Sequence, residues 1–507
     1  MVLCAISVLL LAACGSTVPV ATTGQLSIGV GADTQTVSAP LGATAAGSSL
    51  PTSASVRSSK GSITTSSSAA ADPSAPEQSG SSSAGTSTDS SADHATAIAT
   101  KGPGWDAAKV YIGLVEIRDS TTAMQAAGLK SVATGDQEAQ GNAVADYFNS
   151  RGGLFGRKIQ IVYDNHANAN VQAQPNVEAQ ASCTKFTQDQ RVVAVVNTQT
   201  GIDTPNYREC LSKAGIPLFG VSISPIDDAA LKDARGLFYP VIVPTWNRFA
   251  PVFAKRLNAL GYFHGWDTAN GRASSTPSKL GAYIHDDPAS ERSYQLAARA
   301  FAAIGHAPAL VVRWQNYNDA SNAVLQFRSA GITHVFGLDA AQFLFAVQAE
   351  SQHYRPRYAV QTGNGPGVAM EANAPAAQNV GALGVGTAPA MDINHALGDI
   401  TPGGKLCRQI FASHGQNFTG AYFTEAFAYS ICDSIRALVA GFQAGSGLTT
   451  HAFQSGLGRV GSSFPPAMTF GSGLSATYPV FPGVGRDIGW QTQCSCYNYL
   501  NSTVDSF

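Results

Sequence analysis

The chain contains few charges of either sign and no stripe of basic residues. Only 13% of its 507 residues are charged, and 31 Lys and Arg nearly balance 33 Asp and Glu, which gives a formal net charge of −2. A surface that binds nucleic acid concentrates Lys and Arg on one face. The composition therefore argues against nucleic acid as a partner.

Long apolar runs and the common catalytic signatures are also missing. Beyond the first residues, no apolar run approaches the roughly 18 residues of a membrane-spanning helix, and the chain has no Gly-x-Ser-x-Gly elbow, His-Glu-x-x-His motif or Walker loop. Ser222, His285 and His334 lie at predicted strand ends, where a secreted enzyme could use them, but capping and packing are commoner roles for such side chains. We therefore expect a protein that is not an enzyme and needs neither cofactor nor metal.

A short apolar run near the start ends abruptly at a cysteine. The stretch SVLLLAACGST covers residues 7–17, and it is shorter than the roughly 20 apolar residues that span a bilayer. It is typical of a secretory signal, and its Leu-Ala-Ala-Cys sequence resembles a bacterial lipobox. We expect residues 1–14 to be a lipoprotein signal peptide with the lipid on Cys14. The alternative is an ordinary secretory signal with a chance cysteine, and the Lys or Arg usual at the start of a signal is absent.

Residues 15–104 are rich in Ser, Thr, Ala, Gly and Pro and contain almost no aromatic side chains. Such a composition buries too little apolar surface to offset the entropy of the chain. We expect a disordered linker there, followed by a globular part over residues 105–507. About 400 residues are too many for one core and suggest two lobes.

Six cysteines lie in the globular part, which suggests disulfides in an exported domain. They are Cys183, Cys210, Cys407, Cys432, Cys494 and Cys496. Six cysteines allow 15 pairings, and the sequence does not choose among them. We favour pairs of sequence neighbours, while a metal site at Cys-Ser-Cys is the weaker alternative because no His lies at ligand spacing.

Short apolar runs alternate with amphipathic stretches along the globular part. The predicted strands are 110–116, 158–163, 192–196, 216–221, 280–285, 309–314, 334–338 and 358–361, and the predicted helices include 137–151, 246–260, 294–304 and 320–329. Alternation of strand and helix predicts parallel sheets with crossover helices. Two sets of about four such units predict two similar lobes.

The strand-to-helix junctions carry polar residues, and three of them place a capping residue directly before proline. Thr204, Ser224 and Asp287 each precede a proline, and Asp339 follows the strand 334–338. A cap followed by proline is typical of a helix start. Because ligands of open α/β sheets bind outside the carboxyl ends of the strands, we expect a shared site in a cleft between the lobes.

The stretch YFNSRGGLFGRKIQIVYDN, residues 147–165, resembles a segment near the start of the leucine/isoleucine/valine-binding-protein-like family. These are type 1 solute-binding proteins of ABC transporters, and further similarity runs through 192–224, 279–287, 317–338 and 380–386. The resemblance implies an α/β fold of two lobes joined by three crossovers, each lobe a mostly parallel sheet flanked by helices. Lobe 1 would span about 108–243 and 387–468, and lobe 2 about 244–386 and 469–507. A disulfide that occurs in the family supports the pairing of Cys183 with Cys210.

The resemblance also implies where a ligand binds. A ligand carboxylate would be held by the loops that contain Gln199, Thr200 and Gly201, and Ser222 and Ser224. In lobe 2 the family usually has two aromatic residues and an acidic residue near Thr362 and Asn364, and all three are absent here. Asp287 or Asp339 could replace the acidic residue, because an ammonium group needs a carboxylate partner. The alternative is a ligand without an ammonium group.

The resemblance indicates a lipid-anchored protein on the extracytoplasmic face of a bacterial cell membrane. It would trap a small polar solute, such as an amino-acid-like molecule, amide or carboxylate, by hinge closure. Its partners would be that solute and the ABC transporter permease to which the solute is delivered. The alternatives are a sensor of the same fold that reports to a partner protein, or a degenerate binding lipoprotein without a transport role.

Overall fold

The computed structural model describes residues 98–122, 132–199, 201–315, 319–393, 401–418, 421–502 and 505–507. Cys14, most of the expected linker and Thr200 lie outside these ranges. No helix in the described part is long and apolar enough to cross a membrane.

The first sheet has five parallel strands in the order β2-β1-β3-β4-β5. They are β1 (Lys109–Ile117), β2 (Lys158–His166), β3 (Ala194–Asn197), β4 (Leu218–Gly220) and β5 (Phe238–Pro240). The apolar runs of the sequence form these strands because both faces of a parallel sheet are covered by helices.

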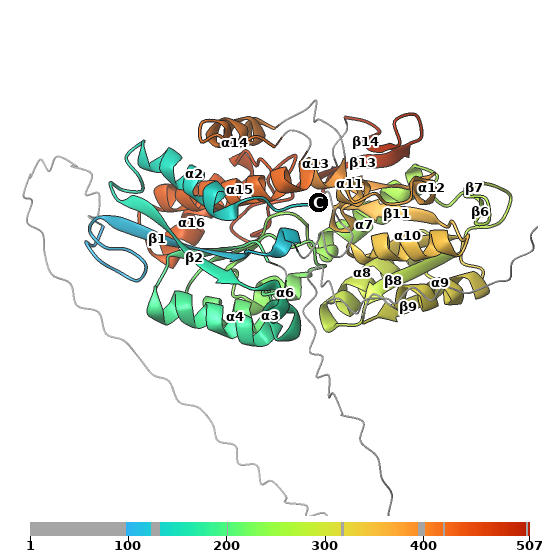
Figure 1. The fold of residues 1–507 in the computed structure, drawn as a ribbon, viewed down its shortest axis with the longest axis horizontal. Coiled ribbons are helices and arrows are strands. Elements are labelled where there is room, and N and C mark those ends of the chain that lie inside the picture. The colour runs from blue at the N-terminus through green and yellow to red at the C-terminus, as the bar shows by residue number, and fades with distance from the viewer. Residues whose placement is uncertain are drawn as a thin grey trace, which may run out of the picture. The chain divides into compact units, whose positions relative to one another are not determined.

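The helices around the first sheet come from two distant parts of the sequence. The earlier group is α2 (Gln137–Asn149), α3 (Asn168–Ala173), α4 (Pro175–Thr184), the π-helix η1 (Lys185–Asp189), α5 (Pro205–Lys213) and α6 (Asp228–Asp233). The later group is α14 (Pro402–Ala412), α15 (Tyr422–Gly445), α16 (Thr450–Val460) and the 3₁₀ turn η3 (Gly461–Ser463). In Figure 1, α2 and α15 lie on one side of this sheet and α3 and α4 on the other.

The second sheet is parallel over five strands and continues into an antiparallel edge. Its order is β14-β13-β12-β11-β10-β8-β9, with β15 paired to β13. The strands are β8 (Leu280–His285), β9 (Leu310–Trp314), β10 (His334–Gly337), β11 (Arg357–Gln361), β12 (Leu383–Gly386), β13 (Val484–Gln491), β14 (Cys496–Tyr499) and β15 (Asp505–Ser506).

Helices and alternating strand residues give the second sheet a core on each face. The helices are α7 (Trp246–Ala259), α8 (Pro288–Ala303), α9 (Asp319–Ser329), α10 (Ala341–Ser351), η2 (Thr362–Asn364), α11 (Pro366–Glu371) and α12 (Ala376–Asn379), and a short hairpin of β6 (Trp266–Asp267) and β7 (Arg272–Ala273) lies between α7 and β8 in the sequence. The helix α13 (Pro389–Asp392) follows β12, and its Ala390 and Met391 pack in the core of the first sheet. Along β10, Val335 packs in one core and Phe336 in the other, because successive side chains of a strand point to opposite faces of the sheet.

Three chain segments cross between the two sheets, and hydrogen bonds join all three. The Thr387 hydroxyl donates to the Ile242 carbonyl at 3.2 Å, and the Phe481 amide donates to the Pro240 carbonyl at 3.0 Å. The Phe470 amide donates to the Thr387 carbonyl at 3.3 Å. Any relative movement of the lobes therefore bends the chain at these three hydrogen-bonded crossings.

Two boundaries differ from the sequence-based expectation. Residues 98–104, which we assigned to the linker, belong to the fold, because the Ala99 carbonyl accepts from Trp105 Nε1 and from the Arg157 guanidinium. Leu474 and Phe481, which we assigned to lobe 2, pack in the core of the first sheet. The third crossing therefore falls next to β13, and not near residue 468.

The predicted helix start at Ser224 is wrong, whereas those at Thr204 and Asp287 are confirmed. The Ser222 hydroxyl accepts from the Ser224 amide at 3.0 Å and makes a local turn. The following helix, α6, begins four residues later, and the Asp227 carboxylate caps it by accepting from the Ala230 amide.

All six cysteines of the globular part are paired with their sequence neighbours. Cys183–Cys210 joins α4 to α5, and Cys407–Cys432 joins α14 to α15. The third disulfide, Cys494–Cys496, closes the tip of the hairpin between β13 and β14. This is the connectivity that we favoured from the sequence.

A charged network at the carboxyl end of β2 fastens that strand to α4. His166 lies between the Asp164 carboxylate, 2.9 Å from Nε2, and the Glu178 carboxylate, 2.6 Å from Nδ1. Burial opposes a charged imidazole, but the two carboxylates outweigh it and raise the pKa of His166 above its ordinary value. Although burial alone would raise it, the pKa of Asp164 falls to about 2 through its bonds to His166 and Ser182. The fold therefore favours the protonated form of His166.

We predict that His166→Gln lowers the free energy of unfolding at pH 6 and that this loss shrinks as the pH rises. A raised pKa means that the stability from His166 is complete below the ordinary value near 6.5 and is lost as the pH passes the folded value. Urea unfolding at pH 6 should show a loss of about 1–2 kcal/mol, shrinking by pH 9. The exposed His451→Gln serves as the control, and an equal loss at both pH values would contradict this interpretation.

Candidate functional site

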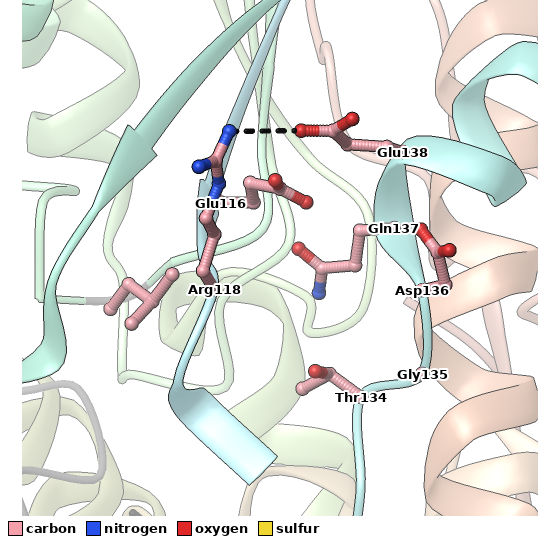
Figure 2. A pocket seen from close by; sticks show the side chains of 8 residues that line it. Glu116, Arg118, Thr134, Gly135, Asp136, Gln137 and Glu138 are labelled. Atoms are coloured by element: carbon pink, nitrogen blue, oxygen red, sulfur yellow. Dashed lines mark hydrogen bonds and ion pairs between the residues drawn. The ribbon is translucent and has the colours of Figure 1, made fainter. Parts of the chain in front are cut away.

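A cavity of about 520 Å³ lies where the carboxyl end of β1 meets the start of α2. Its lining consists of Glu116, Ile117 and Arg118 from the end of β1, and of Thr134, Gly135, Asp136, Gln137 and Glu138 from the turn into α2. Figure 2 shows the side chains of Glu116 and Gln137 pointing from these two elements into the same space. We call this space the β1 cavity.

The turn into α2 is shaped by its own sequence. Gly135 has φ +74°, a left-handed conformation that glycine adopts without strain. The Asp136 carboxylate caps α2 by accepting from the Ala139 amide at 2.9 Å. Gln140 donates to the Thr134 carbonyl at 3.1 Å, and Thr424 of α15 donates to the Ala133 carbonyl at 2.7 Å. The wall of the β1 cavity is thus held from two helices.

Glu116 is an acidic residue near the end of an otherwise apolar strand, and its side chain is buried. Burial, and then the negative charge of Glu138, raise the pKa of Glu116 to about 7. Arg118 reaches Glu138 at 3.4 Å across the gap between β1 and α2 (Figure 2), but the Arg118 side chain is largely exposed and that of Glu138 is half-buried. The β1 cavity is therefore acidic, with one carboxyl that titrates near neutral pH.

Gln137 connects the β1 cavity to the loop after β3. Its Oε1 accepts from the Thr198 hydroxyl at 2.8 Å and from Gln199 Nε2 at 3.4 Å. These bonds fix the orientation of the amide. Its Nε2 is buried and has no hydrogen-bond partner among the described residues. Because a buried donor without a partner is costly, this group is suited to a ligand oxygen.

The predicted ligand residues of lobe 1 lie on two loops, after β3 and after β4. Gln199 is buried beside Gln137, and Gly201 is half-buried. Ser222 is buried and Ser224 half-buried, and their hydrogen bond to each other shapes the second loop. Thr200 falls outside the described residues, so its predicted role stays a prediction.

The predicted residues of lobe 2 gather at the carboxyl ends of β8, β10 and β11. Asp287 caps α8 and pairs with His285 at 2.9 Å. Asn364 Nδ2 donates to the Asp339 carbonyl at 2.8 Å, and the Thr362 hydroxyl bonds to the Thr387 hydroxyl at 2.9 Å. Asp287, Thr362 and Asn364 thus have structural partners. Their contact with a ligand therefore stays a prediction.

Asp339 differs from these three because one of its carboxylate oxygens is unsatisfied. Its Oδ1 accepts from the Ala341 amide at 2.9 Å, while its buried Oδ2 has no partner among the described residues. Burial raises the pKa of Asp339 to about 6. In the described part of the chain, no three His, Cys, Asp or Glu side chains are close enough to hold a metal ion.

The two lobes approach each other at these loops. A Cβ on Gly363 would lie 3.0 Å from the Ile223 carbonyl oxygen, so the loop after β11 touches the loop after β4. Arg292 of α8 donates to the Asp227 carboxylate of α6 at 2.5 Å. The polar ends of both sheets therefore face each other across one interface.

No protein-family model matches the sequence, and no curated protein matches it. Solved structures do match. The chain is similar to a periplasmic binding protein type 1 from Bordetella pertussis Tohama I, with 12% identity over 78% of this chain and 99% of that one, at a TM-score of 0.55. The chain has the type 1 periplasmic-binding fold.

Two further solved structures share this fold. A fatty acid ABC transporter substrate-binding protein from Thermomonospora curvata is 12% identical over 80% of this chain and 95% of that one, with a TM-score of 0.56. A branched chain amino acid ABC transporter protein from Thermus thermophilus, with bound valine, is 13% identical over 79% of this chain and 96% of that one, with a TM-score of 0.55. The two-lobed α/β architecture that the sequence predicted is therefore confirmed.

Within the type 1 periplasmic-binding fold, the sequence-based reasoning missed the β1 cavity. It gave no role to Glu116, Gln137 or Glu138. The available signal was Glu116 itself, because a carboxylate near the end of the apolar strand KVYIGLVEI has to face either solvent or a site.

We predict that Glu116→Gln stabilises the fold above neutral pH. The pKa of Glu116 rises from 4.5 to about 7 in the fold. Between about pH 4.5 and 7, Glu116 is therefore ionised in the unfolded chain but still protonated in the fold. The free energy of unfolding of the wild type falls over this range because ionisation favours the unfolded chain. The variant lacks this loss. Its free energy of unfolding at pH 8 should exceed that of the wild type by about 1–3 kcal/mol, measured by urea titration.

The matched control is Glu291→Gln, which removes a half-exposed carboxylate on α8. It should leave the pH dependence of unfolding unchanged. An equal stability of wild type and Glu116→Gln at both pH 5 and pH 8 would mean that Glu116 has an ordinary pKa.

Proposed function

We propose that the protein is an extracytoplasmic solute-binding protein that takes a small polar solute between its lobes and delivers it to an ABC permease. The observation that carries this proposal is the approach of the Ser222–Ser224 loop to the Thr362–Asn364 loop, where Gly363 lies against Ile223. Strand ends of two sheets that meet in this way make a site that opens and closes when the lobes move.

The polar groups near this interface favour a polar solute. Gln137 Nε2, Asn197 Nδ2 and Asp339 Oδ2 are buried without partners among the described residues. Each lies at or beside the carboxyl end of a strand, where a solute with donors and acceptors would satisfy it. An amino-acid-like molecule, an amide or a carboxylate belongs to this class.

The side chains that an enzyme could use are already engaged. The Ser222 hydroxyl accepts from Ser224, His285 pairs with Asp287, and His334 bonds to the Tyr262 carbonyl at 2.8 Å. Burial lowers the pKa of His334 to about 4, which makes it a neutral core residue. The proposal therefore assigns binding, and no reaction, to this site.

The proposal includes a lipid on Cys14 and a tether over the following residues. It rests on the apolar run before Cys14 and on the Ser- and Thr-rich composition after it. Such a tether would keep the binding lobes near the membrane that holds the permease. Mass spectrometry of the protein from a bacterial membrane fraction tests it, since Cys14→Ser should abolish the lipid mass.

A thermal-shift screen of the full chain tests solute binding. The panel holds amino acids, amides, carboxylates and amines, each at a millimolar concentration. A solute at about 100 times its dissociation constant adds about 2.7 kcal/mol of stability, which a melting curve resolves. A folded protein that responds to none of these classes would contradict the proposal.

We predict that Arg292→Gln weakens binding by speeding dissociation. Arg292 and Asp227 form an ion pair between the lobes. Opening of the lobes would separate the two side chains, so this pair stabilises only the closed form. Because Arg292 is half-exposed, the loss should be modest, about two- to fivefold in affinity. Stopped-flow measurement with a solute from the screen should place the change in the dissociation rate.

Arg313→Gln is the matched control. Arg313 has a similar exposure and pairs with Glu291 within lobe 2, so closure does not alter its contact. An equal effect of both substitutions would mean that the Asp227–Arg292 pair has no part in closure.

A further inference from the structure

We propose that the β1 cavity binds the cationic end of the solute, and that the solute is a small organic ammonium with a hydroxyl or carbonyl oxygen close to its nitrogen. This inference rests on the proposed solute-binding function and names the class of solute. It places the ammonium in lobe 1, between β1 and α2, and not at Asp287 or Asp339 of lobe 2.

The charges of the β1 cavity favour a cation. Three of its side chains are acidic, namely Glu116, Asp136 and Glu138, and one is basic, Arg118. The Asp136 carboxylate is already engaged as the cap of α2. Arg118 extends toward solvent, with 69% of its side chain exposed, so it screens the cavity only weakly. An ammonium group between Glu116 and Glu138 would gain charge-assisted hydrogen bonds to both carboxyls, although Glu138 already forms an ion pair with Arg118.

Gln137 supplies an independent requirement. Its Nε2 is buried and unpartnered among the described residues, and Figure 2 shows the side chain extending from α2 toward β1 beside the β1 cavity. Thr198 and Gln199 bind Oε1, so the amide cannot turn over without losing those bonds. The free donor needs an acceptor oxygen on the solute. A simple metal cation has no such oxygen, which favours an organic ammonium.

The size of the β1 cavity fits a small molecule. Small-molecule sites usually measure about 300–1,000 Å³, and this cavity measures about 520 Å³. A carboxylate placed in it would meet Glu116 and Glu138 at close range. The cavity therefore selects against an anionic end, and a zwitterionic solute would have to direct its carboxylate toward the loops after β3 and β4.

Binding should strengthen as the pH rises through neutrality. Glu116 faces Glu138 and Asp136 of α2 and Arg118 of its own segment, and Tyr163 of β2 lies nearby as a neutral phenol. Burial and the neighbouring carboxylates favour the protonated form of Glu116. An ammonium needs the ionised form, so proton release from Glu116 accompanies binding at pH 6 and largely disappears at pH 8.

Calorimetric titration of the full chain with three small probes of similar size tests this inference. The probes are ethanolammonium, its neutral analogue ethylene glycol, and the anion glycolate, each at pH 6 and pH 8. Ethanolammonium should bind, more tightly at pH 8, while ethylene glycol and glycolate should not. Glu116→Gln and Glu138→Gln should each weaken ethanolammonium binding about tenfold or more, and Glu291→Gln on α8 should not change it.

Gln137→Met separates the requirement for an acceptor oxygen on the solute from the requirement for a cationic group. It should weaken ethanolammonium binding but leave the affinity for ethylammonium, which lacks the oxygen, unchanged. Circular dichroism and melting curves show that each variant is folded.

The outcomes distinguish this inference from the function on which it rests. If ethanolammonium and ethylammonium fail to bind while a carboxylate or amide from the screen binds, the cation inference is wrong and the solute-binding function stands. If ammonium probes bind equally to wild type, Glu116→Gln and Glu138→Gln, the site lies elsewhere and the inference is again wrong. If no class of solute binds the folded chain, both proposals fail.

Discussion

Hydrogen bonds join the three chain crossings and tie the two lobes to each other. Thr387 is bonded to the first crossing through its hydroxyl and to the segment before the third crossing through its carbonyl. Its hydroxyl also contacts Thr362 at the end of β11. The position of the binding loops is therefore tied to the crossings, and movement of one lobe is transmitted directly to the loops that face the other.

The interface between the lobes carries different chemistry on its two sides. On the side of lobe 1, Glu116 and Glu138 make the β1 cavity acidic, and Gln137 offers a free donor. On the side of lobe 2, most polar side chains are engaged with one another, and Asp339 alone among the predicted residues keeps an unsatisfied oxygen. In the function that we propose, lobe 1 makes the first and stronger contacts with a solute and lobe 2 completes the enclosure.

The sequence was sufficient for the fold because its evidence is local. Apolar runs bounded by turn residues marked the strands, and a cap before proline marked the helix starts at Thr204 and Asp287. The same rule failed at Ser224, where a hydrogen bond from the backbone to Ser222 forms a turn instead of a helix. The β1 cavity could not be predicted, because Glu116 and Gln137 are 21 positions apart and are brought together only when α2 packs against β2, the neighbour of β1 in the sheet. The late third crossing was missed for a similar reason, since Leu474 and Phe481 are assigned to a lobe only by their packing.

Hydrogen–deuterium exchange of the full chain, with and without the solute that raises its melting temperature most, tests most directly whether the site lies between the lobes. The expected result is slower exchange in both facing loops, 222–224 from lobe 1 and 362–364 from lobe 2, together with the crossing at 386–388. Protection confined to one lobe, or an unchanged exchange pattern with a bound solute, would contradict a site that closes between the lobes.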